Sequence, residues 1–258
     1  MLIDFHHHLN SHYYPSLDAY VDDLARIGDE FGVTKFCVNG LGPGYQNFTN
    51  EDTLYAWRKL PDLVVPFAAY DLDYDQPAQI AEFAAQGFKG LKVINPKHNY
   101  DDDAYFPAYE TAAAQGMVIL FHTGFVAPSV VGQQKRSSSA RMRPIYLESI
   151  ARSYPEMTLV GAHFGAPWFA EAAVMMRTIS NIYFDISGGA FWNPPALFSD
   201  LTLQLVVFGK FIFGTDSLAR DFGIPYAQCL KMFDELKLSE EVREKILYRN
   251  AAKILGLE

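Results

Sequence analysis

Three consecutive histidines near the N-terminus carry the first chemical information in the sequence. They follow Leu2-Ile3-Asp4-Phe5, a largely apolar run that predicts a buried β-strand. Side chains two apart on a strand point to the same face, so His6 and His8 project together while His7 points away. Two adjacent imidazoles form half of a divalent-metal site. A tag would precede a strand pattern rather than interrupt it, and a purely structural pair is the remaining alternative.

Other side chains able to bind a metal or move a proton recur where later apolar runs end. Together with the first pair, they are His6, His8, His122, His163 and Asp216. Lys92 lies within the fourth such run. A single histidine after an apolar run is usually a hydrogen-bonded core residue. Four of the seven histidines and one aspartate at equivalent positions favour one metal site, if the fold brings these run ends together.

The elements that must bring them together alternate along the chain. Apolar runs predict strands at 2–8, 33–38, 63–70, 88–94, 117–122, 158–163, 182–186 and 211–215. Helical periodicity predicts helices at 16–31, 51–60, 78–86, 102–115, 144–153, 169–178, 196–203, 226–236 and 240–247.

Eight strand-then-helix units in 258 residues predict an α/β fold, namely a single (β/α)8 TIM barrel spanning residues 1–258. The carboxyl ends of its strands form one rim, where catalytic groups are found in barrel enzymes. The alternative, a doubly wound sheet, needs a glycine-rich fingerprint after the first strand, where this chain has histidines.

Bulk properties narrow the class of partner. Half of the residues are hydrophobic and the formal net charge is -9, which argues against nucleic acid or an anionic membrane as the main partner. Only two cysteines occur, both within apolar or helical runs, as expected of buried free thiols in a reducing compartment. We find no leader pattern or membrane-length apolar run, and therefore predict a cytoplasmic enzyme acting on a small molecule.

These motifs resemble a known family. His6-x-His8, His122-Thr123-Gly124, Ala162-His163-Phe164-Gly165 and Gly214-Thr215-Asp216-Ser217 are similar to the amidohydrolase superfamily. Within it, the chain resembles the amidohydrolase-related (amidohydrolase 2) branch of TIM-barrel metal-dependent hydrolases, which includes aminocarboxymuconate-semialdehyde decarboxylase. The segments 87–92 and 143–148 also resemble that branch, although the chain is shorter than these decarboxylases.

The resemblance implies one divalent ion held by four ligands. They are His6, His8, His122 and Asp216. Three imidazoles and one carboxylate suit zinc first, with Mn, Fe or Co as alternatives. A bound ion lowers the pKa of its water to about 7. Asp216 is then expected to shuttle the water's proton, and His163 to polarise a substrate carbonyl or hold the water.

Lys92 is open to three interpretations. In two-metal members of the superfamily a carboxylated lysine on strand four bridges the ions and the strand-six histidine is a ligand. We do not expect a second ion here. Lys92 can instead pair with a substrate carboxylate, or extend along the rim with a structural role.

The remaining candidates would contact substrate. Arg141 and Arg143 follow a long loop and suit an anionic substrate, although the alternative is solvated charge. Trp168 and Trp192 follow strands six and seven and can form the walls of a planar pocket, or pack in the core.

Three functions remain in competition at this stage. The first is metal-dependent hydrolysis of a small ester, lactone or amide that carries a carboxylate. The second is non-oxidative decarboxylation of an aromatic or unsaturated acid, using the same metal, His163 and Asp216. The third, from another class, is a barrel that binds a metal or ligand without catalysis. A homodimer is expected only on general grounds.

Overall fold

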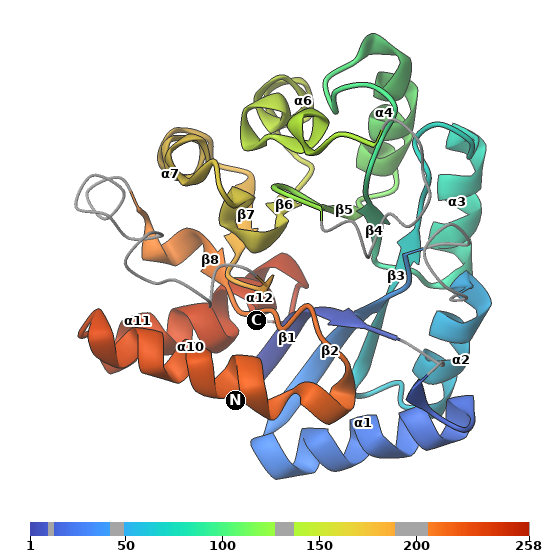
Figure 1. Cartoon of the computed structure of the whole chain (residues 1–258). Coiled ribbons are helices and arrows are strands. Elements are labelled where there is room, and N and C mark those ends of the chain that lie inside the picture. Colours follow the sequence, from blue (N-terminus) through green and yellow to red (C-terminus); the bar gives the residue numbers. More distant parts are fainter. Residues whose placement is uncertain (10–12, 42–48, 127–136, 189–205, 258) are drawn as a thin grey trace.

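Eight parallel strands form the centre of the molecule, which we describe from a computed structural model (Figure 1). The structure describes the chain except for residues 10–12, 42–48, 127–136, 189–205 and 258. The strands are β1 (Leu2–His8), β2 (Val33–Asn39), β3 (Val64–Ala69), β4 (Gly90–Val93), β5 (Val118–Phe121), β6 (Leu159–Gly161), β7 (Ile182–Asp185) and β8 (Phe211–Ile212). Each strand pairs with the next along the chain, in the order β1 to β8.

The last strand meets the first, so the sheet curves into a nearly closed barrel. The amide of Phe5 donates to the carbonyl of Phe213 (3.0 Å) and the amide of Asp216 donates to the carbonyl of His6 (2.7 Å). Beyond them, the amide of His8 donates to Ser217 (3.1 Å). The predicted α/β class and TIM-barrel fold are therefore confirmed.

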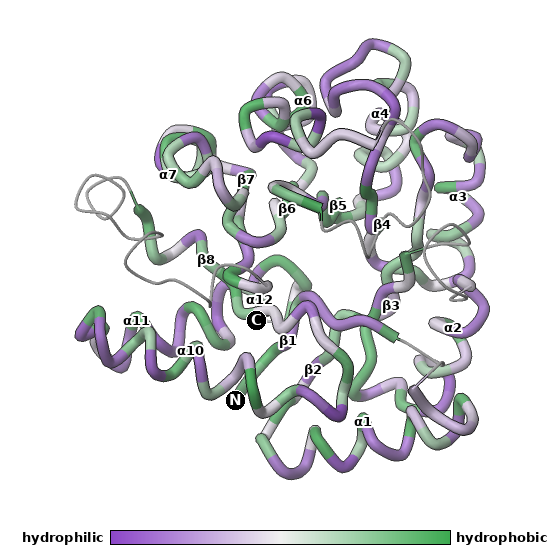
Figure 2. The backbone as a smooth tube through the Cα atoms, in the orientation of Figure 1, coloured by the Kyte–Doolittle hydropathy of each residue, from purple (hydrophilic) through white to green (hydrophobic). Residues whose placement is uncertain are grey.

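Helices surround this barrel (Figure 1). They are α1 (Leu17–Phe31), α2 (Asn50–Lys59), α3 (Pro77–Gln86), α4 (Phe106–Ala114), α6 (Leu147–Ser153), α7 (Phe169–Thr178), α10 (Gly223–Glu235), α11 (Glu240–Glu244) and α12 (Asn250–Ile254). Local chemistry explains their ends: the Ser16 side chain caps α1, and Gly32 ends it with a left-handed φ of 68°. Their tubes carry both hydrophilic and hydrophobic residues in Figure 2, as expected for helices with one buried face.

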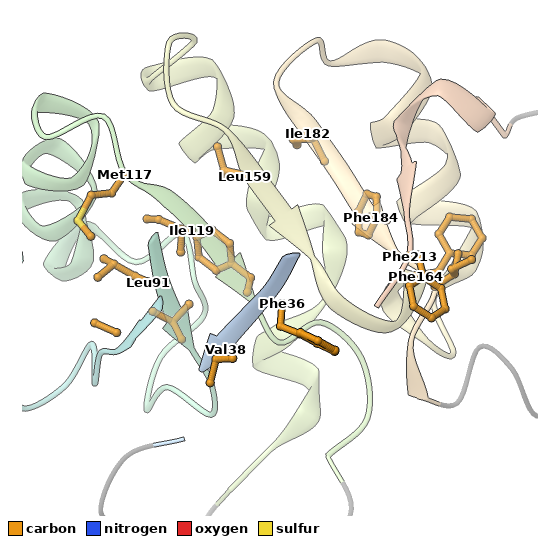
Figure 3. Packing of buried hydrophobic residues seen from close by; sticks show 14 of the residues in the cluster. Phe36, Val38, Leu91, Met117, Ile119, Leu159, Phe164, Ile182, Phe184 and Phe213 are labelled. Atoms are coloured by element: carbon orange, nitrogen blue, oxygen red, sulfur yellow. The ribbon is translucent and has the colours of Figure 1, made fainter. Parts of the chain in front are cut away.

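Two apolar layers hold the barrel together. The inner layer gathers alternate strand residues, including Phe5, Phe67 and Leu120, and Ala251 of α12 packs against it. The outer layer lies between the strands and the helices. Figure 3 shows part of it, with Phe36, Val38, Leu91, Met117, Ile119, Leu159, Phe164, Ile182, Phe184 and Phe213. Because both faces of each strand are buried, the strands are almost continuously apolar.

An irregularity in β1 determines the direction in which the His6 side chain points. Strict alternation would place Phe5 and His6 on opposite faces, yet Phe5 packs on Phe67 in the inner layer while His6 reaches Lys92 at the barrel rim. The pairing of β1 with β2 shifts register between Asp4 and His7, as in a β-bulge. The bulge lets both residues face inward, a device common beside active sites.

Several element ends differ from the sequence-based expectation. β6 ends at Gly161, and the expected strand end at His163 is instead a 3-10 turn, Ala162–Gly165, in which His163 has a φ of 59°. β8 ends at Ile212, before Asp216, whose φ is 52°. Left-handed backbone is incompatible with a strand, which is why β6 ends before His163. The helix expected at 196–203 lies outside the described residues.

The C-terminal helices also depart from expectation. The helix expected at 240–247 is α11, and it continues through a π-helical turn, Lys245–Arg249, into α12. Among the helices in the described part of the chain, none combines the length and apolar character needed to cross a membrane.

The junction of β1 and β8 depends on Asp4, whose side chain is fully buried. Its carboxylate accepts hydrogen bonds from the amide of His6 (3.2 Å), the amide of Thr215 (2.9 Å) and the hydroxyl of Thr215 (2.6 Å). Nδ1 of His7 lies 2.9 Å from its second oxygen and completes the set. One side chain of β1 therefore binds the segment that follows β8.

We expect Asp4→Ala to lower the free energy of unfolding by about 3 kcal/mol, because it leaves several buried donors unpaired. Urea unfolding followed by circular dichroism measures this. Asp22→Ala, on the exposed face of α1, is the matched control and should stay within about 0.5 kcal/mol of the parent. Equal losses in the two variants would show that Asp4 does not hold the junction.

Candidate metal and catalytic centre

The predicted rim residues meet in space. His6 and His8 end β1, Lys92 comes from β4, and His122, His163 and Asp216 follow β5, β6 and β8. Nε2 of His6 lies 2.9 Å from Nζ of Lys92 and 3.3 Å from Oδ1 of Asp216. Nε2 of His8 lies 2.8 Å from the same oxygen of Asp216. On the other side of the cluster, Nε2 of His163 lies 3.2 Å from Nδ1 of His122, and Nδ1 of His163 lies 3.8 Å from Oδ2 of Asp216. The fold thus connects all six side chains, although His122 reaches the others only through His163 and is not in the group His6, His8 and Asp216 whose ligand atoms lie close together.

The lone pairs of His6 and His8 converge on Asp216. Nδ1 of His6 lies 2.8 Å from the carboxylate of Asp185, so it carries the proton and Nε2 is left with a lone pair. Nδ1 of His8 faces the carbonyl of Asn39 at 3.3 Å, which assigns its proton in the same way. Nε2 of His8 and an oxygen of Asp216 then face each other as two hydrogen-bond acceptors. Such a contact is stable only if the ring of His8 takes up a second proton or a cation lies between the two atoms.

This arrangement fits a divalent metal ion. One ligand atom each from His6, His8 and Asp216 lies within 4.8 Å of the others. The buried Nε2 of His122 has no hydrogen-bond partner among the described residues. An unpaired buried ring nitrogen is costly unless a ligand uses it. Neutral imidazoles and a carboxylate are the ligands that zinc and related ions prefer.

Burial and charge tune the protonation of these groups in the metal-free chain. Burial, and then Lys92, lowers the pKa of His6 to about 4, although Asp216 and Asp185 act in the opposite direction. Burial lowers the pKa of Lys92 to about 8, against the attraction of the same two carboxylates. Burial, with His163, also holds the pKa of His122 well below its usual range. The imidazoles of His6 and His122 are therefore neutral at pH 7, the form that binds a metal.

The carboxylate of Asp216 stays ionised. Burial alone would raise its pKa, but His163, His6 and the second ring proton that His8 takes up where no other cation separates the two groups hold the pKa well below the usual range. Its side chain remains 29% exposed. Asp216 therefore combines a negative charge with access from outside the barrel.

Sequence reasoning missed Asp185, the last residue of β7. Its buried carboxylate accepts from the amides of His163 (2.8 Å) and Ser187 (3.0 Å), and from the Ser187 hydroxyl (2.6 Å), besides its contact with His6. Burial opposes ionisation of Asp185, but His6 and His163 outweigh it and lower the pKa strongly. The sequence did offer one signal for this role, because Asp185 is an acidic residue within the otherwise apolar run 182–186.

A second group of possible metal ligands is already hydrogen-bonded to a protein side chain. His6, His163 and Asp185 also offer atoms within 4.8 Å of one another. The hydroxyl oxygen of Ser187 lies 3.3 Å from Nδ1 of His6, 2.9 Å from Nδ1 of His163 and 2.6 Å from Asp185. Hydrogen bonds therefore satisfy this group without an ion.

Strained backbone and a glycine complete the centre. His163 and Asp216 both adopt left-handed φ values, which cost free energy in residues other than glycine and concentrate at functional sites. Gly188 packs against both: a Cβ there would lie 2.8 Å from Nδ1 of His163 and 3.2 Å from Oδ2 of Asp216. A side chain at position 188 would therefore push on the centre.

The substrate-binding candidates have different surroundings. The guanidinium of Arg143 pairs with Glu171 of α7 and lies over the ring of Trp168, 5.6 Å from its centroid, so its charge is used within the chain. Arg141 donates to the carbonyl of Pro96 at 3.3 Å. Substrate contacts by Lys92, Arg141, Arg143 and Trp168 stay predictions, and Trp192 lies outside the described residues.

Comparison with known proteins places this centre in context. The amidohydrolase family model matches residues 3–257. A protein described as an amidohydrolase from Staphylococcus aureus is 19% identical, with a TM-score of 0.69 and 99% of each chain covered. No curated protein matches the chain.

Two further solved structures carry named activities. A probable 2-pyrone-4,6-dicarboxylic acid hydrolase from Acinetobacter baumannii, with citric acid bound, is 17% identical, with a TM-score of 0.67 and 99% of each chain covered. A 5-carboxyvanillate decarboxylase from Novosphingobium aromaticivorans, with bound manganese, is 14% identical; its TM-score is 0.67, with 99% of this chain and 97% of that chain covered. At these identities the likeness shows the fold alone.

Gly188→Ala tests the crowding of the centre. Gly116 is the matched control, because its φ of 63° is close to the 58° of Gly188 and a Cβ there would meet nothing within 4 Å. Both alanines cost about 1 kcal/mol for the left-handed backbone. Gly188→Ala should lose about 1–3 kcal/mol more, typical of overpacking, and should weaken Zn²⁺ affinity in a chelator competition. Matching stability and affinity in the two variants would contradict the geometry.

Proposed function

Because this chain belongs to the amidohydrolase family, we propose that it is a metal-dependent hydrolase of a small ester, lactone or amide that carries a carboxylate. The observation that carries the proposal is the convergence of the Nε2 atoms of His6 and His8 on Oδ1 of Asp216, at 3.3 Å and 2.8 Å. Such a set of acceptors is stabilised by a shared cation.

Four residues would hold one divalent ion. They are His6, His8, His122 and Asp216. Zinc is our first choice because neutral imidazoles dominate the set, and Mn, Fe or Co suit the same ligands. A divalent ion supplies Lewis acidity toward water and toward a substrate oxygen.

Asp216 is placed to move the proton that hydrolysis requires. Its Oδ1 faces the two histidines, and its Oδ2 faces Nδ1 of His163 at 3.8 Å. Because the carboxylate is ionised and partly exposed, it takes a proton from the attacking water and then gives it to the leaving oxygen or nitrogen. This cycle needs only one carboxylate that is open to substrate.

His163 supports this step from the side. Its ring lowers the pKa of Asp216 and contacts His122. Both ring nitrogens lie near protein groups, Ser187 and His122, so direct contact with a substrate carbonyl would require one of these interactions to open. We therefore assign His163 chiefly to the electrostatics and orientation of the centre.

Lys92 favours an anionic substrate. Its side chain is 1% exposed, and its pKa of about 8 leaves it mostly charged at pH 7. A buried ammonium beside the ligands attracts a substrate carboxylate toward the reacting atoms. The same feature suits decarboxylation of a carboxylic acid, which is our second candidate. We retain a cytoplasmic location and a homodimer as predictions.

Metal content and turnover, measured together, test the proposal. We expect about one Zn²⁺ or related ion per chain by elemental analysis, with hydrolysis of some members of a panel of carboxylated lactones, esters and amides. Chelation should abolish turnover and the added ion should restore it. Carbon dioxide release from aromatic acids would assign the second candidate. Metal binding without any turnover would leave a binding protein, and no metal binding at all would refute the centre.

Asp216→Asn separates proton transfer from the rest of the site. We expect turnover per bound ion to fall about 10²-fold or more, because the amide cannot accept the proton, while the fold is kept. The matched control is Asp221→Asn, on an exposed carboxylate paired with Arg220, which should leave turnover unchanged. Unaltered turnover per bound ion in Asp216→Asn would remove the carboxylate from the mechanism.

A further inference from the structure

Ser187 has no assigned role, yet its hydroxyl occupies the middle of the centre. The side chain is fully buried, two residues after the end of β7. Its oxygen lies 2.6 Å from Oδ1 of Asp185 and 2.9 Å from Nδ1 of His163. A buried hydroxyl has one hydrogen to donate and lone pairs to accept with, so these two contacts determine each other.

The direction of each hydrogen bond follows from the carboxylate. Asp185 is ionised and can only accept, so the Ser187 hydroxyl donates its single hydrogen to Asp185. The oxygen of Ser187 is then an acceptor toward His163. Nδ1 of His163 must therefore carry a hydrogen, and in the neutral ring Nε2 carries a lone pair.

The same logic extends one ring further. Nε2 of His163 lies 3.2 Å from Nδ1 of His122. With a lone pair on Nε2 of His163, Nδ1 of His122 must be the donor. The hydrogen of His122 is then fixed on Nδ1, and its buried Nε2 keeps a lone pair without a partner among the described residues.

We propose that Ser187 is a positioning residue that links Asp185 to His163 and thereby fixes the Nδ1–H tautomer of both His163 and His122. Asp185 acts on His6 directly, through Oδ2. A single buried carboxylate thus sets three imidazoles, two of them through one serine hydroxyl. This inference rests on the proposed function in one respect, namely the metal ion to which His122 would present its Nε2 atom as a ligand.

Removal of the hydroxyl should release this constraint. In Ser187→Ala, Nδ1 of His163 loses its acceptor and the ring can carry its hydrogen on either nitrogen. His122 then populates both tautomers, and only one of them offers Nε2 as a ligand. Loss of a group that orients a ligating histidine typically weakens metal affinity by about 10- to 100-fold.

Imidazole nitrogen NMR reads the tautomers directly. Full-length protein labelled with ¹⁵N-histidine is studied after chelation, so that no ion competes for the rings. Long-range ¹H–¹⁵N correlation distinguishes a protonated from an unprotonated ring nitrogen, and His122→Gln and His163→Gln assign the signals. In the parent protein we expect Nδ1 protonated and Nε2 unprotonated in both residues. The opposite tautomer in either ring would overturn the proposal, with or without a folded Ser187 variant.

Variants then test the serine itself. Ser187→Ala should shift the nitrogen signals of His163 and His122 toward averaged values and weaken Zn²⁺ affinity, whereas Ser187→Thr, which keeps a hydroxyl, should restore both. Ser153→Ala removes an exposed hydroxyl on α6 and is the matched control. Parent-like ring signals in folded Ser187→Ala would refute the positioning role.

The two proposals fail in different ways. If the parent shows the expected tautomers but binds no ion, the proposed function fails and the positioning role of Ser187 stands. If the parent binds one ion while His122 carries its hydrogen on Nε2 after chelation, the positioning role of Ser187 fails and the metal centre stands.

Discussion

A carboxylate removed from water must fill its oxygens with hydrogen-bond donors, and this requirement shapes the whole rim of the barrel. Asp4 and Asp185 are both fully buried. Asp4 collects its donors from the end of β1 and from Thr215 after β8, and so joins the two ends of the sheet. Asp185 collects donors from His6, His163 and Ser187. The polar centre is thus supported by two charges that are buried away from solvent.

The same requirement accounts for the strained backbone. The amide of His163 donates to Asp185, and the amide of Asp216 donates to the carbonyl of His6. Both residues that donate these hydrogen bonds have a left-handed conformation. The cost of about 1–3 kcal/mol for each such residue is offset by the buried bonds. The sharp turns also aim the two side chains across the rim, toward each other and toward His8.

The histidine spacing and the strand-then-helix order were sufficient to predict the fold and the rim residues that the structure brings near one another, because both follow from local periodicity. Asp4, Asp185 and Ser187 escaped prediction because their roles depend on partners far away in sequence, such as Asp185 with His6. The bulge in β1 left no local signature. The pairing of Arg143 with Glu171 likewise had no signal in the sequence, and substrate contact by Arg143 stays a prediction.

The geometry also bears on whether one ion or two would bind. The sequence resemblance implies that a second ion would need the strand-six histidine and a carboxylated lysine as ligands. Here the nitrogens of His163 are engaged by Ser187 and His122. Ser187 also fills the space between His6, His163 and Asp185. A second ion would have to break this buried network, so the hydrogen bonds that orient the first set of ligands disfavour a second ion.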